Sequence, residues 1–164
     1  TIRATTEDLF LEATSGDDFV GIQTYSRSRV GPTGVLDPED GVEVLPLGSE
    51  YWPEALGATI RRAWGVTNGE VPILVTENGI GTDDDDQRIR YIRAALEGVL
   101  DCLDDGIDVL GYTYWSLLDK FEWVLGYGPR FGLAEVDRAA PFSRRLKPSA
   151  AWYAALVRAN ALAD

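Results

Sequence analysis

Three short apolar segments recur along the chain, and each is followed by a longer segment with helical periodicity. We expect strands at residues 19–25 and 72–76, because both segments are rich in β-branched residues and end at polar or glycine-containing turns. A third strand is expected at 107–115. The segment 31–48 is rich in glycine, proline and acidic residues and predicts a long loop. After an aromatic-rich loop that follows the third strand, residues 131–136 are expected to form a shorter extended piece.

The segments between these strands have apolar residues every third or fourth position, which is typical of amphipathic helices. The first helix is expected to open at Pro53, where a missing amide proton has little effect, and to end near Gly65. Its buried stripe is predicted to consist of Leu56, Ile60 and Trp64. The stripe of the second helix is predicted to consist of Ile89, Ile92, Leu96, Val99, Leu100 and Leu103. The acidic run 83–86 suits the N-terminus of this second helix. A final helix is predicted around Pro148, Trp152, Leu156 and Val157.

Successive strand-then-helix units favour a parallel sheet, and parallel sheets are buried on both faces, which fits the continuous apolar segments. The fold class is therefore α/β, and both a doubly wound sheet and an eightfold barrel fit the pattern. The 164 residues are 45% hydrophobic and 26% charged, an ordinary composition for a globular chain with one sizeable core. A dinucleotide-binding function is disfavoured, because Gly79-Ile80-Gly81 precedes four aspartates that would repel a pyrophosphate.

The chain contains no histidine and a single cysteine, Cys102. Triads that use an imidazole base, zinc sites and disulfides are therefore disfavoured, and carboxylates remain as the catalytic groups. Cys102 lies in the second helical segment and is interpreted as a buried, inert thiol. Asp83 and Asp85 alternate as in a calcium loop but lack the glycine that such a loop requires, so no metal site is expected.

A formal net charge of -12 would repel a nucleic-acid backbone or an anionic membrane surface. Apolar runs are far shorter than the roughly 20 residues that a bilayer requires, so neither a membrane span nor a secretory leader is expected. We therefore expect a cytoplasmic protein. The chain has no methionine and begins with Thr1, which favours a segment of a longer protein.

Ligands of parallel α/β sheets bind where the strands end, and Tyr25, Glu77 and Trp115 all lie at such ends. Each also has a purely structural interpretation, as a core tyrosine, an exposed turn residue or a packed tryptophan. The loop 115–123 adds a second tryptophan and carboxylates. Aromatic faces that meet a sugar ring, with carboxylates that accept its hydroxyl protons, form a reasonable carbohydrate site. A hydrophobic plug over a barrel mouth is the alternative.

From Asp18 onward the sequence resembles glycoside hydrolase family one, the β-glucosidase and β-galactosidase family. Val75-Thr76-Glu77-Asn78-Gly79 resembles the nucleophile motif of the family. Residues 115–123, together with Gly126-Tyr127 and Arg130-Phe131-Gly132-Leu133, resemble its second signature. The resemblance implies that residues 1–164 are the C-terminal segment of one catalytic (β/α)8 TIM-barrel domain, with strands six to eight and their helices present and the N-terminal strands missing.

The resemblance also implies site roles, and it implies no cofactor. Glu77 is expected to be the nucleophile of a retaining hydrolysis of small β-glycosides, and Tyr25 is expected to hydrogen-bond it. The outer sugar hydroxyls are expected to bind Glu122 and Trp123. Trp115 is expected to form the platform under the sugar ring. The pocket is further expected to contain Phe131, and the Trp115-Ser116 peptide is expected to be cis.

Several positions differ from the pattern of the family. Gln23 and Thr24 stand where Asn and Tyr are usual, and Lys120 stands where Asn is usual. The acid/base motif with Asn-Glu-Pro does not occur in this sequence. We therefore expect a second chain that carries the N-terminal barrel strands and the acid/base. The alternative is a carbohydrate-binding or scaffolding fragment without turnover.

Overall fold

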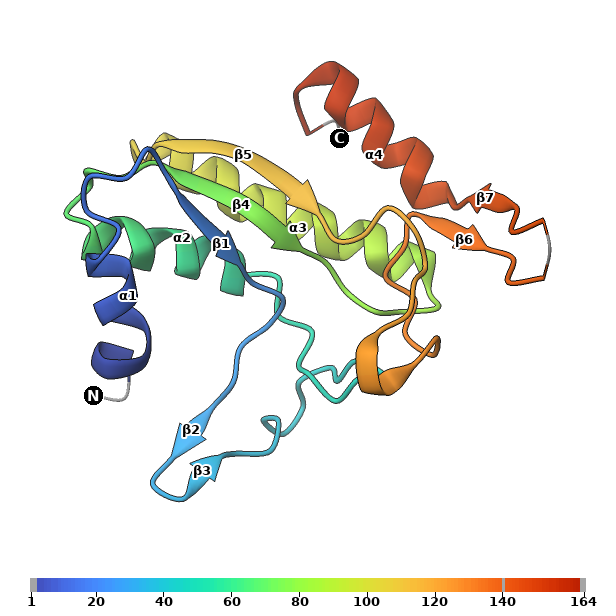
Figure 1. Cartoon of the computed structure of the whole chain (residues 1–164), viewed down its shortest axis with the longest axis horizontal. Helices are drawn as coiled ribbons and strands as arrows, with labels where there is room; N and C mark the ends of the chain where they lie inside the picture. The colour runs from blue at the N-terminus through green and yellow to red at the C-terminus, as the bar shows by residue number, and fades with distance from the viewer. Residues whose placement is uncertain (1–2, 140, 163–164) are drawn as a thin grey trace.

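The structure is a computed structural model that describes residues 3–139 and 141–162. Its centre is a three-stranded parallel sheet in the order β1 (Val20–Gln23), β4 (Ile73–Asn78) and β5 (Val109–Tyr114), as Figure 1 shows. The strands are parallel because a helix follows each of the first two and returns the chain to the same end. In the described part of the chain, β1 and β5 each pair with one neighbour only.

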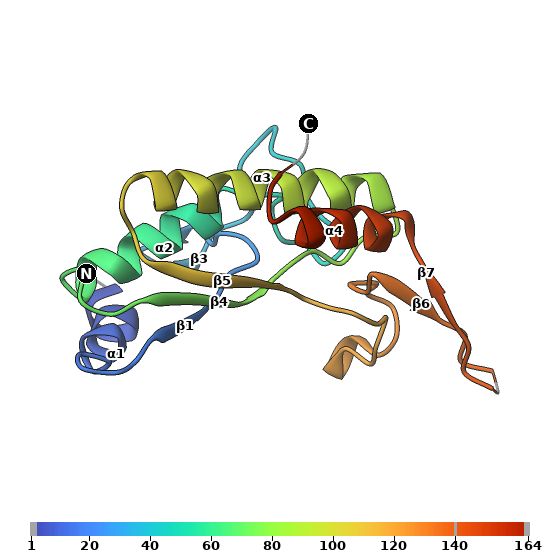
Figure 2. The same ribbon diagram turned by 90° about the horizontal axis from the view of Figure 1, so that it is seen from above.

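Two helices, α2 (Ala55–Val66) and α3 (Asp85–Asp104), cover one face of this sheet together (Figure 2). Helix α3 starts where the sequence suggests, because the side chain of Asp84 accepts hydrogen bonds from the backbone amides of Asp86 and Gln87 at 3.0 and 3.1 Å. The carboxylates of its first turn also suit the positive end of the helix dipole.

The core lies between the sheet and these helices. Ile73 and Val75 of β4 point into it and are fully buried. Helix α2 contributes Leu56 and Ile60, which are also fully buried. Burial of a side chain of this size contributes about 1.5–3 kcal/mol, so these contacts hold β4 firmly against the helices.

Smaller elements surround this core. They are the N-terminal turns η1 (Ala4–Asp8) and α1 (Leu9–Glu12), the hairpin strands β2 (Val30–Gly31) and β3 (Gly34–Val35), the 3-10 turn η2 (Trp123–Leu125), the hairpin strands β6 (Ala134–Val136) and β7 (Arg144–Leu146), and the helix α4 (Pro148–Ala159). Helix α4 packs Trp152 and Leu156 against Ile92 and Leu96 of α3. It thereby ties the C-terminal segment to the layer of helices.

The three predicted strands are confirmed, with different ends. Strand β4 continues through Glu77 and Asn78, which were expected to form a turn, because Thr24 N donates to Glu77 O at 3.2 Å and Trp115 N donates to Asn78 O at 2.9 Å. The predicted start of α2 at Pro53 is wrong. Residues 52–56 form turn hydrogen bonds, and the helix begins at Ala55.

The predicted stripe of α3 is confirmed in part. Ile92, Leu96 and Val99 are buried, but Leu100 and Leu103 are each 44% exposed. Arg88 is buried instead, because its guanidinium binds backbone carbonyls at the end of the sheet. The predicted loop at 31–48 contains Gly31 of β2 and all of β3, which form a short hairpin. Within the described residues, every helix is too short or too polar to cross a bilayer.

Candidate active site

Glu77 lies at the C-terminal end of β4, and its carboxylate binds two side chains from the end of β1. Gln23 Nε2 donates to Glu77 Oε1 at 2.9 Å, and the hydroxyl of Tyr25 donates to Glu77 Oε2. The parallel register places Gln23 opposite Glu77, so both side chains share one face of the sheet. Strand pairing therefore brings together residues that are more than 50 positions apart.

Tyr25 is held between this carboxylate and an aromatic ring. Its ring meets Phe131 edge to face with 6.2 Å between centroids. Burial raises the pKa of Tyr25 far above its ordinary value, and the hydrogen bond and negative charge of Glu77 raise it further. The phenol therefore stays protonated and remains a donor to Glu77. Glu122 also raises this pKa, although less strongly, so its charge lies near the same phenol.

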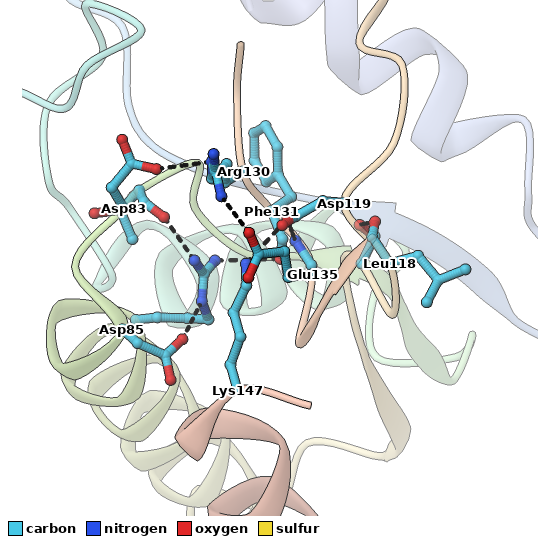
Figure 3. A network of polar contacts seen from close by, with 12 residues as sticks. Asp83, Asp85, Leu118, Asp119, Arg130, Phe131, Glu135 and Lys147 are labelled. Carbon is cyan, nitrogen blue, oxygen red and sulfur yellow. Dashed lines mark hydrogen bonds and ion pairs between the residues drawn. The ribbon is translucent and has the colours of Figure 1, made fainter. Parts of the chain in front are cut away.

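The loop that follows β5 begins with a cis peptide between Trp115 and Ser116, as the family resemblance predicts. Asp119 anchors this loop, because its Oδ1 accepts from Gly132 N at 2.8 Å and from Lys147 Nζ at 3.0 Å. Figure 3 shows this contact of Asp119 and Lys147, with Phe131 next to it. The anchor joins the loop that carries Trp115 to the segment that carries Phe131.

Lys120 connects two of the predicted sugar-binding residues. Its ammonium forms an ion pair with Glu122 at 2.7 Å and lies 4.5 Å from the centre of the Trp115 ring. The ammonium therefore neutralises one carboxylate oxygen and faces the predicted platform. Trp123 lies in η2, is 78% exposed and has a positive φ of 47°.

The structure thus joins five of the six predicted residues in two groups. Glu77, Tyr25 and Phe131 are in contact in one group, and Trp115 and Glu122 are connected through Lys120 in the other. Trp123 belongs to the same loop as the second group. The roles that the family resemblance implies for these residues stay predictions.

Sequence reasoning missed several buried polar residues behind the site. The side chain of Asn78 binds the carbonyl of Thr24, which follows β1, and the hydroxyls of Tyr91 and Tyr112. The guanidinium of Arg88 binds the carbonyls of Ile80, Thr82 and Phe131, the hydroxyl of Tyr114 and the carboxylate of Asp85. The periodicity of α3 alone does not decide whether Tyr91 and Arg88 face the core or the solvent. The available signal was the position of Asn78 within the nucleophile motif, directly after Glu77.

The site offers carboxylates, amides and phenols. Among residues 3–139 and 141–162, no three His, Cys, Asp or Glu side chains are grouped so that they could hold a metal ion. Cys102 is a free and fully buried thiol, as its predicted inert role requires. Burial raises the pKa of Cys102, so the unreactive thiol form is favoured.

Gly79 permits the loop after β5 to approach β4. A Cβ atom at this position would lie 2.1 Å from the carbonyl oxygen of Trp115. We therefore expect Gly79→Ala to displace the Trp115 backbone and to lower the free energy of unfolding by about 1–3 kcal/mol. Urea denaturation measures the loss, and near-ultraviolet circular dichroism reports the tryptophan environment.

Gly65→Ala is the matched control, because Gly65 lies in α2 and a Cβ there meets no atom within 4 Å. Alanine is the better helix former, so this variant is expected to be more stable by up to about 1 kcal/mol. Equal stabilities of the Gly79→Ala variant and the wild type would show that the backbone contact is not tight.

Comparisons with known proteins identify related sequences. Residues 45–162 match the sequence model of the family described as Glycosyl hydrolase family 1. A 1,4-beta-D-glucan glucohydrolase of Thermotoga neapolitana is 35% identical, over 96% of this chain and 38% of the relative. Beta-glucosidase A of Thermotoga maritima is 33% identical, over 90% of this chain and 36% of the relative.

Solved structures agree with these sequence matches. The chain superposes on beta-glycosidase BGL167 with a TM-score of 0.92 and 50% identity, over 99% of this chain and 38% of that one. It superposes on the family 1 β-glucosidase from Thermotoga maritima with a TM-score of 0.81 and 32% identity, over 89% and 36% of the two chains. The chain thus spans less than two fifths of these relatives. The predicted fold, the α/β C-terminal part of a (β/α)8 barrel, is confirmed, and the chain belongs to glycosyl hydrolase family 1.

Proposed function

We propose that this chain contributes the nucleophile and a sugar-binding loop to a retaining β-glycosidase that acts on terminal β-linked glucosides or galactosides. The observation that carries the proposal is the placement of Glu77. Its carboxylate lies at the C-terminal end of a parallel strand and accepts hydrogen bonds from Gln23 and Tyr25. The membership of the chain in glycosyl hydrolase family 1 supports the same chemistry.

In the proposed reaction, a carboxylate oxygen of Glu77 forms a bond to the anomeric carbon while the bond to the leaving-group oxygen breaks. A carboxylic acid supplies the proton to that oxygen. Water later breaks the glycosyl bond to Glu77, the same acid/base group takes a proton from this water, and the configuration is retained. The phenol of Tyr25 remains protonated, so its hydrogen bond orients Glu77 and stabilises its charge in the free enzyme.

The sugar would bind between the two groups of site residues. Trp115 offers a ring face, while Glu122 and Trp123 would accept from and donate to the outer hydroxyls. Phe131 would close the pocket beside Tyr25, which it contacts. Lys120 holds one oxygen of Glu122, so this carboxylate is oriented before a sugar arrives.

We further propose that the acid/base and the remaining barrel strands come from polypeptide outside these 164 residues, either on a second chain or on the same one. The sequence has no Asn-Glu-Pro, and the chain covers 38% of a relative that it matches over 96% of its own length. Within the described residues, β1 and β5 each have one unpaired edge, and this supports the proposal, because an unpaired parallel edge leaves backbone groups without partners.

Covalent labelling tests the function. A 2-deoxy-2-fluoro-β-glucoside with a dinitrophenyl leaving group should inactivate the complete protein and attach its sugar to Glu77, which peptide mass spectrometry can locate. The fluorine slows both the formation and the hydrolysis of the glycosyl-enzyme. The reactive leaving group keeps the formation fast enough, so the glycosyl-enzyme accumulates. A Glu77→Gln variant should remain unlabelled. If the wild type with all its native chains stays unlabelled while it still binds glucose, the non-catalytic carbohydrate-binding alternative is favoured.

A further inference from the structure

Tyr25 donates to Glu77 from a position that β1 does not fix. Strand β1 ends at Gln23. The last backbone hydrogen bond that connects this part of the chain to β4 runs from Thr24 N to Glu77 O at 3.2 Å. A phenol on an unpaired segment of backbone could swing away from its acceptor. Some other contact must therefore hold the backbone at 24–25 if the Tyr25 hydroxyl is to stay on Glu77.

A chain of buried hydrogen bonds provides this contact. Tyr112 Oη donates to Asn78 Oδ1 at 2.8 Å, and Asn78 Nδ2 donates to Tyr91 Oη at 3.0 Å and to Thr24 O at 2.7 Å. Tyr91 Oη then donates to Tyr25 O at 2.7 Å. The carbonyls of both residues after β1 are thus bound by side chains of β4 and α3.

The donors and acceptors of this network allow one direction only. Carbonyl oxygens can only accept, so Asn78 must present its amide nitrogen to Thr24, and its oxygen then faces the hydroxyl of Tyr112. Burial raises the pKa of Tyr91 and also the pKa of Tyr112, so both phenols keep their protons. Asn78 and Tyr91 are 0% exposed, so water does not replace a lost partner easily.

Glu77 and Asn78 are neighbours on β4, and their side chains point to opposite faces of the sheet. The nucleophile therefore faces the site while the adjacent amide faces α3. We propose that Asn78, Tyr91 and Tyr112 are positioning residues that hold the Tyr25 phenol against Glu77. This inference rests on the proposed function, and it assigns the polar core behind the site to the orientation of the nucleophile rather than to stability alone.

A double-mutant cycle in the complete protein tests the proposal. Tyr91→Phe is expected to lower the rate of Glu77 labelling, and kcat, about tenfold with little change in KM, because Tyr25 loses its fixed position. Once Tyr25 is replaced by Phe, there is no phenol left to position. In the Tyr25→Phe background, Tyr91→Phe is therefore expected to change the labelling rate less than twofold.

Controls separate positioning from folding. Tyr112→Phe removes only the first donor of the chain and should give a smaller effect of the same kind, so it decides the question if Tyr91→Phe does not fold. Tyr51→Phe makes the same chemical change on a ring that packs edge to face on Tyr91, and it should leave the rate unchanged. If Tyr91→Phe changes the labelling rate equally with and without the Tyr25 phenol, the positioning role is overturned and the proposed function is not. An unlabelled wild type overturns the proposed function and this role together.

Discussion

Replacing Glu77 by alanine is expected to lower the turnover of an aryl β-glucoside by the complete protein by a factor of roughly 10⁴ or more. The variant removes the atom that forms the bond to the anomeric carbon, and no side chain on the same face of β4 can substitute for it. The measurement is the initial rate with a nitrophenyl β-glucoside. Added sodium azide should restore part of the rate with a dinitrophenyl glucoside, because the space left by the carboxylate admits a small anion.

The product of the rescued reaction makes this prediction specific. Azide attacks from the face that Glu77 occupied, the dinitrophenolate leaves, and the product is the α-glycosyl azide, which proton magnetic resonance distinguishes from the β-anomer. Glu97→Ala is the matched control, since Glu97 is an exposed carboxylate on α3. If Glu77→Ala retains more than a tenth of the wild-type rate, Glu77 is not the nucleophile.

The parallel sheet was predictable because its strands are continuous apolar segments that belong to a buried sheet. The end of β4 was not predictable, since Glu77 and Asn78 have low strand propensity and extend the strand only through their backbone pairing to Thr24 and Trp115. The same pairing sets the distance between Glu77 and Tyr25. Local sequence preference thus located the site, while tertiary hydrogen bonds determined its geometry.

The candidate residues themselves were found from motifs, and their supports were not. A helical wheel places Leu100 and Leu103 of α3 with the apolar residues, yet both are 44% exposed, while the charged Arg88 is 1% exposed. Burial of a guanidinium depends on acceptors that several distant segments supply together. The periodicity of one helix does not show where those acceptors lie. The hub behind the site, formed by Arg88 and the groups that its guanidinium binds, is therefore visible only in the three-dimensional structure.

This hub leads to the largest expected effect on stability. Arg88→Met in the complete protein is expected to lower the free energy of unfolding by about 3–5 kcal/mol, because the variant leaves the half-buried Asp85 and several buried carbonyls without their charged donor. Methionine fills much of the same volume, so the loss reports the polar contacts rather than a cavity. Arg88 Nη2 donates to Thr82 O at 2.6 Å, and Nη1 donates to Ile80 O at 3.0 Å and to Phe131 O at 3.2 Å. All of these acceptors would lose a charged donor.

The negative partner of Arg88 limits how far the structure can relax. Burial alone would raise the pKa of Asp85, but hydrogen bonds from Ser149 and Arg88 outweigh it and hold the pKa below its usual value. Asp85, which Figure 3 labels, also accepts from Ser149 N at 2.7 Å, so it connects α3 to the first turn of α4 and keeps its charge near the position that Arg88 would leave. Arg90→Met is the matched control, since Arg90 is 62% exposed and lies 3.6 Å from Asp84, and it should change stability by less than about 0.5 kcal/mol. Urea unfolding of both variants measures the difference, and a loss below about 1 kcal/mol for Arg88→Met would mean that water replaces the guanidinium.

Because Phe131 O is among the acceptors and the Phe131 ring meets Tyr25, the same variant should also slow Glu77 labelling, which would connect the stability of the hub to the geometry of the nucleophile.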